Sequence, residues 1–111
     1  MTVEQICAVL EARVFVPGKG DKEVSSVSAG DLLSYVMGTA QEGALWVTIQ
    51  THLNVAAVAV LKDIPLILLA AGRQPAPDLA ARCAEEGICL AGTDASLYGA
   101  CARLASLGLP G

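Results

Sequence analysis

The polar and apolar positions of the N-terminal third predict short elements of irregular spacing. Residues 2–5 (Thr-Val-Glu-Gln) match a capping box, and the apolar residues that follow form one helical face through about residue 12. Residues 13–16 favour a short strand, and the segment 24–27 favours a second extended stretch. A short helix is expected over residues 32–37.

From residue 44 onward, apolar runs alternate regularly with amphipathic segments. Strands are expected over residues 44–49, 64–69 and 88–90, and helices over residues 53–61, 78–86 and 95–107. Gly87 follows the second of these helices and suits a left-handed helix end. The alternation is typical of a parallel sheet with helices on both faces. The sequence therefore predicts an α/β fold: a single three-layer α/β/α domain over residues 1–111, with a mostly parallel sheet and an irregular N-terminal third.

The helix expected from Leu53 to Leu61 is apolar on every side. Two interpretations remain open: the helix is enclosed within the domain, or its outer face meets a second copy of the chain. Hydrophobic residues make up 54% of the sequence and charged residues only 16%, against about 25% in typical soluble domains. Part of the surface is therefore expected to be covered, and we predict a homodimer with this helix as the candidate interface.

Charge and hydropathy exclude two classes of partner. The net charge of −4 argues against binding to nucleic acid. The most apolar stretch, residues 53–71, is interrupted by Asn54, Lys62, Asp63 and Pro65, so no membrane span is expected. Because the first residues lack the basic and apolar regions of a signal peptide, we predict a cytoplasmic protein.

The four cysteines indicate buried free thiols. Cys7, Cys83, Cys89 and Cys101 include no C-x-x-C pair, and the single histidine, His52, is far from all of them in sequence. Zinc and iron–sulfur sites normally contain at least one close ligand pair, so neither a metal nor another cofactor is expected. All four cysteines fall in segments that we expect to be buried.

Motifs for catalysis are absent. The Gly-Lys pair within residues 17–20 lacks the rest of a phosphate-binding P-loop, and no serine has a nucleophile-elbow pattern around it. We therefore expect no enzymatic activity and assign no catalytic residue.

Candidate ligand-binding residues follow the predicted strands. In parallel sheets, ligands bind beyond the carboxyl ends of the strands, where helix N-termini present free amides. The polar or flexible residues at these positions are Asp31, Thr48, Gln50, Thr51, His52, Asn54, Gly72, Arg73 and Thr93. Thr51 or Asn54 could cap the following helix. Two interpretations of the polar cluster remain open: it holds an anionic or nucleotide-like ligand, or it satisfies backbone groups and supports a dimer contact.

Two segments of the chain resemble the DRTGG domain family, which in turn resembles the N-terminal domain of HPr kinase/phosphorylase. They are Gly-Asp-Leu-Leu-Ser-Tyr-Val-Met at residues 30–37 and Gly-Ala-Leu-Trp-Val-Thr-Ile-Gln-Thr-His-Leu-Asn-Val-Ala-Ala-Val-Ala at residues 43–59. The resemblance extends over essentially the whole chain and is most specific over residues 46–58. It identifies the chain as a stand-alone DRTGG-like domain.

The resemblance implies a homodimeric α/β domain that regulates or senses a ligand. Family members are fused to CBS domains, phosphotransacetylase or the HPr kinase catalytic domain, whose P-loop this chain lacks. Some stand-alone relatives are encoded near hydrogenase or electron-transfer subunits, which implies a redox enzyme as partner. The family's Thr-Gly-Gly after the central strand is here Ala70-Ala71-Gly72, so the candidate site shifts to residues 48–54.

These observations lead to one functional prediction and one alternative. The first is a non-catalytic regulatory homodimer that binds a small anionic ligand or nucleotide at the carboxyl ends of the strands. The alternative is an accessory subunit without a small-molecule ligand, which docks a hydrogenase-type redox enzyme or a metabolic enzyme.

Overall fold

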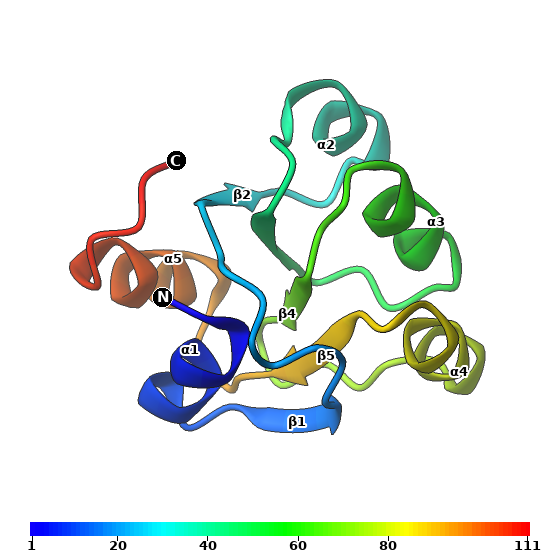
Figure 1. Cartoon of the computed structure of the whole chain (residues 1–111), viewed down its shortest axis with the longest axis horizontal. Helices are drawn as coiled ribbons and strands as arrows, with labels where there is room; N and C mark the ends of the chain where they lie inside the picture. The colour runs from blue at the N-terminus through cyan, green and yellow to red at the C-terminus, as the bar shows by residue number, and fades with distance from the viewer.

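The computed structural model describes all 111 residues and contains one five-stranded sheet (Figure 1). In chain order the elements are α1 (Val3–Leu10), β1 (Arg13–Val16), β2 (Ser26–Ala29), α2 (Leu33–Thr39), β3 (Ala44–Thr48), α3 (Asn54–Leu61), β4 (Leu66–Leu69), α4 (Pro77–Glu86), β5 (Cys89–Gly92) and α5 (Leu97–Ser106). The strand order is β1-β5-β4-β3-β2. Strands β2 to β5 are parallel, and β1 is antiparallel to β5 at one edge. The predicted α/β fold with a mostly parallel sheet is confirmed.

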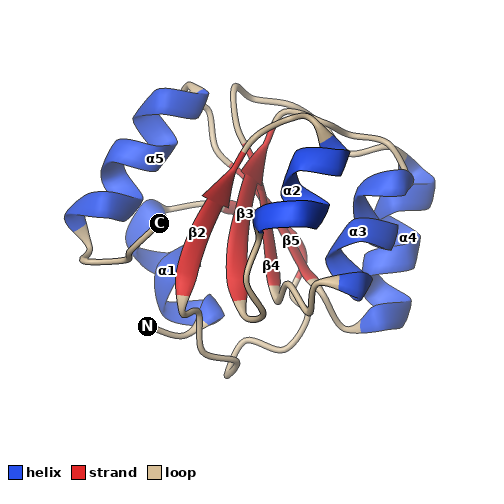
Figure 2. Cartoon of the chain, turned by 90° about the horizontal axis from the view of Figure 1, so that it is seen from above, coloured by secondary structure: helices blue, strands red, loops and turns tan.

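Helices cover both faces of the sheet (Figure 2). Helices α1 and α5 lie on one face, where Ile6, Leu45, Leu68 and Leu104 belong to one buried cluster. Helices α2, α3 and α4 lie on the other face, and Trp46 is fully buried in a second cluster there. Alternate residues of β3 and β4 contribute to the two clusters, as the period of two in a strand requires.

Local signals explain most of the helix boundaries. The capping box at Thr2 and Gln5 is present, and α1 ends at Leu10, earlier than predicted, because Glu11 adopts a left-handed conformation (φ 52°). Gly87 ends α4 in the left-handed conformation that the sequence predicts (φ 69°). Helix α5 begins later than predicted, where the Ser96 hydroxyl accepts a hydrogen bond from the amide of Gly99.

The predicted cap of α3 is wrong. Leu53 is the N-cap residue and makes no side-chain capping bond, so neither Thr51 nor Asn54 caps this helix. Helix α3 is instead stabilised by the packing of its inner apolar face in the core between α2 and α4.

Helix α3 is only half covered within the domain. Val55, Ala56, Val58 and Ala59 are buried, whereas Leu53, Ala57, Val60 and Leu61 are exposed. The structure therefore rules out the interpretation that the domain encloses this apolar helix completely.

Candidate functional site

The loops that follow the four parallel strands lie together beyond the carboxyl ends of these strands. We call this region the carboxyl-end rim. The pairings β2–β3, β3–β4 and β4–β5 are all parallel and in register, so the four strands end side by side (Figure 2). All nine predicted site residues lie at the ends of these strands, in the loops that follow them or, for Asn54, at the first position of the next helix. The hydrogen bonds of the rim divide them into residues that hold the loops together and residues whose side chains are free.

Asp31 joins the loop after β2 to the loop after β3. Its Oδ1 accepts hydrogen bonds from the Thr48 hydroxyl (2.9 Å) and from the backbone amide of Ile49 (2.8 Å). The Gln50 side-chain amide donates to the backbone oxygen of Asp31 (3.1 Å), and the Gln50 backbone amide donates to the Thr48 hydroxyl (3.2 Å). Three predicted ligand-binding residues, Asp31, Thr48 and Gln50, therefore satisfy one another, and Thr48 is fully buried.

Trp46, in the core, also stabilises the loop after β2. Its indole Nε1 donates to the backbone oxygen of Gly30 at 2.9 Å. Because Trp46 is fully buried, this bond ties the start of the loop after β2 to the core.

The remaining loops of the rim are linked through backbone groups. The amide of Ala76 donates to the carbonyl of Thr51 (3.0 Å), and the amide of Gly72 donates to the carbonyl of Thr93 (2.9 Å). The Thr93 hydroxyl also accepts from the amide of Ala95 (3.2 Å). Thr51, Gly72 and Thr93 are thus brought into the rim as connections between neighbouring loops.

The other three predicted residues present unpaired side chains. His52, Asn54 and Arg73 are exposed, and their side chains make no hydrogen bond or ion pair within the chain. His52 and Asn54 lie at the start of α3, and Arg73 lies in the loop after the adjacent strand β4. The backbone amides of Leu53 and Asn54 also have no acceptor within the chain. This part of the rim can offer hydrogen-bond donors to an anion or a polar ligand.

The loop after β4 departs from the conformation that an alanine prefers. Ala71 (φ 59°) and Gly72 (φ 67°) both adopt the left-handed conformation. A Cβ on Gly72 would lie 3.3 Å from Asp94 Oδ1, so this turn has little room for a side chain. Two consecutive left-handed residues suit a pair of glycines, which is what the resemblance implies at these positions, and here the first of them is Ala71.

A charged pair completes the rim beside β5. Arg13 contacts Asp94 at 2.9 Å, and both side chains are largely exposed. The hydrogen bond and charge of Arg13 lower the pKa of Asp94, and Asp94 raises the pKa of Arg13 in return. Asp94 is therefore engaged with Arg13 and ionised at neutral pH.

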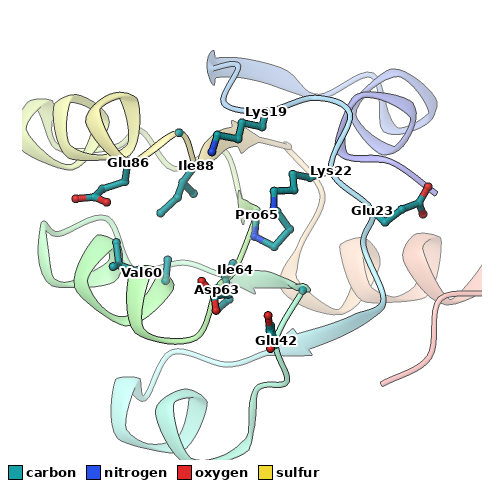
Figure 3. A pocket seen from close by; sticks show the side chains of 13 residues that line it. Lys19, Lys22, Glu23, Glu42, Val60, Asp63, Ile64, Pro65, Glu86 and Ile88 are labelled. Carbon is teal, nitrogen blue, oxygen red and sulfur yellow. The ribbon is translucent and has the colours of Figure 1, made fainter.

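The sequence did not predict a cavity at the opposite ends of the strands. It has a volume of about 310 Å³ and lies at the amino ends of the strands. We call this region the amino-end rim. Figure 3 shows Lys19 and Lys22 extending over this cavity from the connection between β1 and β2. The acidic residues around it are Glu23, Glu42, Asp63 and Glu86. The sequence feature that could have predicted these lining residues is the presence of charged residues in each turn that precedes a strand.

The cysteines fit the prediction of buried free thiols in part. Cys7, Cys83 and Cys89 are buried and unbridged, whereas Cys101 on α5 is only half-buried, so the prediction for Cys101 is corrected. Burial raises the pKa of the Cys83 thiol to about 11. No group of three or more His, Cys, Asp or Glu side chains is arranged to hold a metal ion.

Comparisons with known proteins give a match in structure but not in sequence. No protein-family model and no curated protein matches the sequence. The structure is similar to a crystal structure of the CBS and DRTGG domains of the regulatory region of Clostridium perfringens pyrophosphatase, complexed with its activator diadenosine tetraphosphate. The TM-score is 0.71 at 14% sequence identity. The two share a fold. The match covers 98% of this chain and 47% of that chain, so this chain spans about half the length of its structural relative.

The lengths of the helices bear on the membrane prediction. None of them is both long and apolar enough to cross a bilayer.

Proposed function

We propose that this chain is a non-catalytic regulatory module of the DRTGG type, which binds a nucleotide or another small anionic ligand at the carboxyl-end rim. The observation that carries the proposal is the set of unpaired side chains of His52, Asn54 and Arg73. His52 and Asn54 follow the loop after β3, which Asp31, Thr48 and Gln50 hold in place through hydrogen bonds. Arg73 lies in the loop after β4, where the Gly72 amide donates to the carbonyl of Thr93. Donors held in this way lose little conformational freedom when a ligand binds.

The fold comparison supports the same class of function. The similar structure belongs to a regulatory region and contains a nucleotide activator. At this rim, Arg73 and His52 supply donors suited to phosphate oxygens. The adjacent amides at the start of α3 favour negative charge through the helix dipole.

Isothermal titration calorimetry tests the proposal with four probes: diadenosine tetraphosphate, ATP, AMP and inorganic phosphate. At least one nucleotide should bind the wild-type chain. The double variant His52→Ala/Arg73→Ala should bind it roughly 10- to 100-fold more weakly, since a hydrogen bond to a charged group contributes about 1.5–3 kcal/mol.

Lys62→Ala is the matched control, because Lys62 follows the C-terminal end of α3 and its removal also deletes one positive charge. The control should bind like the wild type. An equal loss in the control would show that the effect is one of net charge, and no binding of any probe would contradict the proposed ligand class.

A homodimer is the second part of the proposal. Large apolar side chains are exposed on or directly before α2 and α3, and we call them the apolar face. They are Leu32 (67% exposed), Tyr35 (56%), Met37 (42%), Leu53 (44%), Val60 (36%) and Leu61 (69%). The two helices pack against each other and lie side by side in both Figure 1 and Figure 2. Exposed apolar side chains on two neighbouring helices are typical of an interface, and a second copy of the chain would cover them by two-fold symmetry.

Light scattering coupled to size-exclusion chromatography tests the dimer. The wild type should have twice the chain mass of 11.3 kDa at tens of micromolar. Leu61→Glu should yield a monomer of unchanged helicity, because it places a charge in the apolar contact. Val9→Glu is the control, since Val9 is 48% exposed on α1, on the other side of the sheet. Val58→Glu is unsuitable because Val58 is in the core.

The same apolar face favours the alternative of an accessory subunit that docks a redox or metabolic enzyme in the cytoplasm. Purification of the tagged chain from its native host would distinguish the two. A stoichiometric enzyme partner that Leu61→Glu loses and Val9→Glu retains would favour the accessory role. A pure homodimer would favour the regulatory module.

A further inference from the structure

Two cysteines that are 82 positions apart in the sequence meet across one face of the sheet. Cys7 lies on the buried side of α1, and Cys89 is the first residue of β5; their Sγ atoms are 3.9 Å apart. Cys83 belongs to the core on the opposite face, and Cys101 lies on α5. Among the four thiols, only Cys7 and Cys89 are in contact.

A cavity gives reagents a route to this pair. It has a volume of about 570 Å³ and is lined by Glu4, Ala8 and Glu11 of α1 or its end, by Val14 and Pro17 of the following segment, and by both cysteines. Cys7 is 8% exposed, whereas Cys89 is 1% exposed. A small oxidant that enters the cavity therefore encounters Cys7 before Cys89.

We propose that Cys7 and Cys89 are a redox modification site, in which a hydroperoxide oxidises Cys7 and Cys89 then closes an intramolecular disulfide. The pair is independent of the ligand-binding rim, because Cys89 begins the strand whose other end reaches that rim.

The chemistry balances with hydrogen peroxide as the oxidant. The Cys7 thiolate attacks one peroxide oxygen, the O–O bond breaks, and an S–O bond forms to give a sulfenic acid; the departing hydroxide takes up the thiol proton and leaves as water. The Cys89 sulfur then attacks the sulfenic sulfur. The S–S bond forms as the S–O bond breaks, and the second hydroxide combines with the Cys89 proton to give water. Two thiols and one peroxide yield one disulfide and two waters.

The contact between the thiols determines which of them ionises first. The hydrogen bond from the Cys89 thiol lowers the pKa of Cys7, and this effect exceeds the opposing effect of burial. The pKa of Cys89 is raised by the same contact and by burial. Because Cys7 is also the more exposed of the two thiols and the thiolate is the reactive form, we assign Cys7 as the attacking residue and Cys89 as the resolving residue.

Closing the bond requires a modest approach of the two sulfurs, from 3.9 Å to about 2.05 Å. The backbone of Cys89 is held firmly: its amide donates to the carbonyl of Pro65 at 3.0 Å, and a Cβ on Gly18 would lie 2.3 Å from its nitrogen. The movement is therefore expected in the Cys7 side chain and in α1, which carries it.

Titration of the full chain with hydrogen peroxide tests the proposal. The number of thiols per unfolded chain should fall from four to two, with a mass loss of two hydrogen atoms, and dithiothreitol should reverse both changes. Digestion with trypsin and a glutamyl endopeptidase that also cuts after aspartate places Cys7 in peptide 5–11 and Cys89 in peptide 87–94, separate from the other two cysteines. These two peptides should be found linked.

Single variants establish the order of events. Cys89→Ser should accumulate a dimedone-reactive sulfenic acid on Cys7, whereas Cys7→Ser should form neither the adduct nor an intramolecular disulfide. Cys83→Ala and Cys101→Ala are matched controls and should form the disulfide as the wild type does.

The contrary outcomes are equally specific. Four thiols remaining while free cysteine at the same peroxide concentration is oxidised would overturn the proposal, as would a disulfide that includes Cys83 or Cys101. If either variant of the pair fails to fold, the peptide map of the oxidised wild type decides the question alone.

Discussion

The two rims of the sheet are held together in different ways. At the carboxyl-end rim, part-buried side-chain bonds add to the backbone links between the loops: Asp31 accepts from Thr48 and Ile49, and Trp46 donates to Gly30. At the amino-end rim, backbone groups make the links, as from the amide of Gly43 to the carbonyl of Asp63 (3.1 Å) and from the amide of Cys89 to the carbonyl of Pro65 (3.0 Å), and the side-chain bond of Ser25 is exposed.

This difference distinguishes polar side chains that bond within the fold from polar side chains that are free to contact a ligand. The side chains of Asp31, Thr48 and Gln50 are used in bonds between the loops of the carboxyl-end rim, whereas those of Thr51, His52, Asn54 and Arg73 have no hydrogen-bond partner within the chain. Where backbone groups link the turns, charged side chains such as Lys19 and Glu42 are free to line a cavity. Substitutions of rim side chains should therefore affect stability mainly at the carboxyl-end rim.

The largest effect is expected at Asp31. Asp31→Ala should lower the free energy of unfolding by about 2–3 kcal/mol, because it leaves the Thr48 hydroxyl and the Ile49 amide without their acceptor. Urea denaturation followed by circular dichroism measures the change. Glu42→Ala, an exposed acidic residue at the amino-end rim, should change stability by no more than about 0.5 kcal/mol. Equal effects at the two positions would refute the difference between the rims.

The next comparison involves two side chains that donate to a loop carbonyl. Trp46→Phe should destabilise by about 2 kcal/mol, since the partly buried carbonyl of Gly30 loses its donor and the smaller ring leaves a gap in the core. Ser25 donates to the carbonyl of Glu42 (3.2 Å) in an exposed position at the other rim. Ser25→Ala should remain within about 0.5 kcal/mol of the wild type because water replaces the hydroxyl. The same denaturation experiment measures both.

Replacing Ala71, which has a left-handed backbone conformation, with glycine is expected to increase stability. Ala71→Gly should raise the free energy of unfolding by about 0.5–1 kcal/mol, because glycine adopts φ 59° without steric strain. Asp63, at the amino-end rim, has a similar φ of 50°, but aspartate tolerates this conformation better than alanine. Asp63→Gly should accordingly stabilise less, and thermal unfolding by calorimetry compares the two. A loss of stability in Ala71→Gly would show that its methyl group contributes packing.

The smallest effect concerns pH. Arg13 lowers the pKa of Asp94, so the pair favours the folded state above the unfolded-state pKa of Asp94, about 3.9, and this contribution is lost as the pH falls through the lower folded-state pKa. Asp94→Asn should be slightly less stable than the wild type at pH 7 and equal to it in strong acid. Salt should reduce the difference because both side chains are exposed. A difference that persists below the folded-state pKa would point to a role for Asp94 beyond its charge.

Much of the fold could be predicted from the sequence because its pattern is local. The apolar runs that became β3, β4 and β5 are continuous, as buried parallel strands require, and the helices between them have clear lengths. The antiparallel placement of β1 beside β5 could not be predicted, because it depends on a contact between residues such as Arg13 and Gly92 that are far apart in the sequence.

The candidate site was predictable in its position but not in the roles of its members. Parallel strands must bring Asp31, Thr48 and Arg73 to one rim, and they do. Which of them would bond to one another depends on side-chain directions that a sequence pattern does not contain. The contact between Cys7 and Cys89 was missed for a related reason, since their positions along α1 and β5 meet only when α1 packs on the sheet.

The contact between Cys7 and Cys89 also determines how the chain would respond to mechanical force. With the disulfide closed, pulling on the two ends can extend only residues 1–7 and 89–111, roughly 100 Å of chain, whereas the reduced chain of 111 residues extends to roughly 380 Å. The segment between the cysteines, which contains four of the five strands, would be shielded from the load. Single-molecule stretching would therefore register the redox state of this domain as a length.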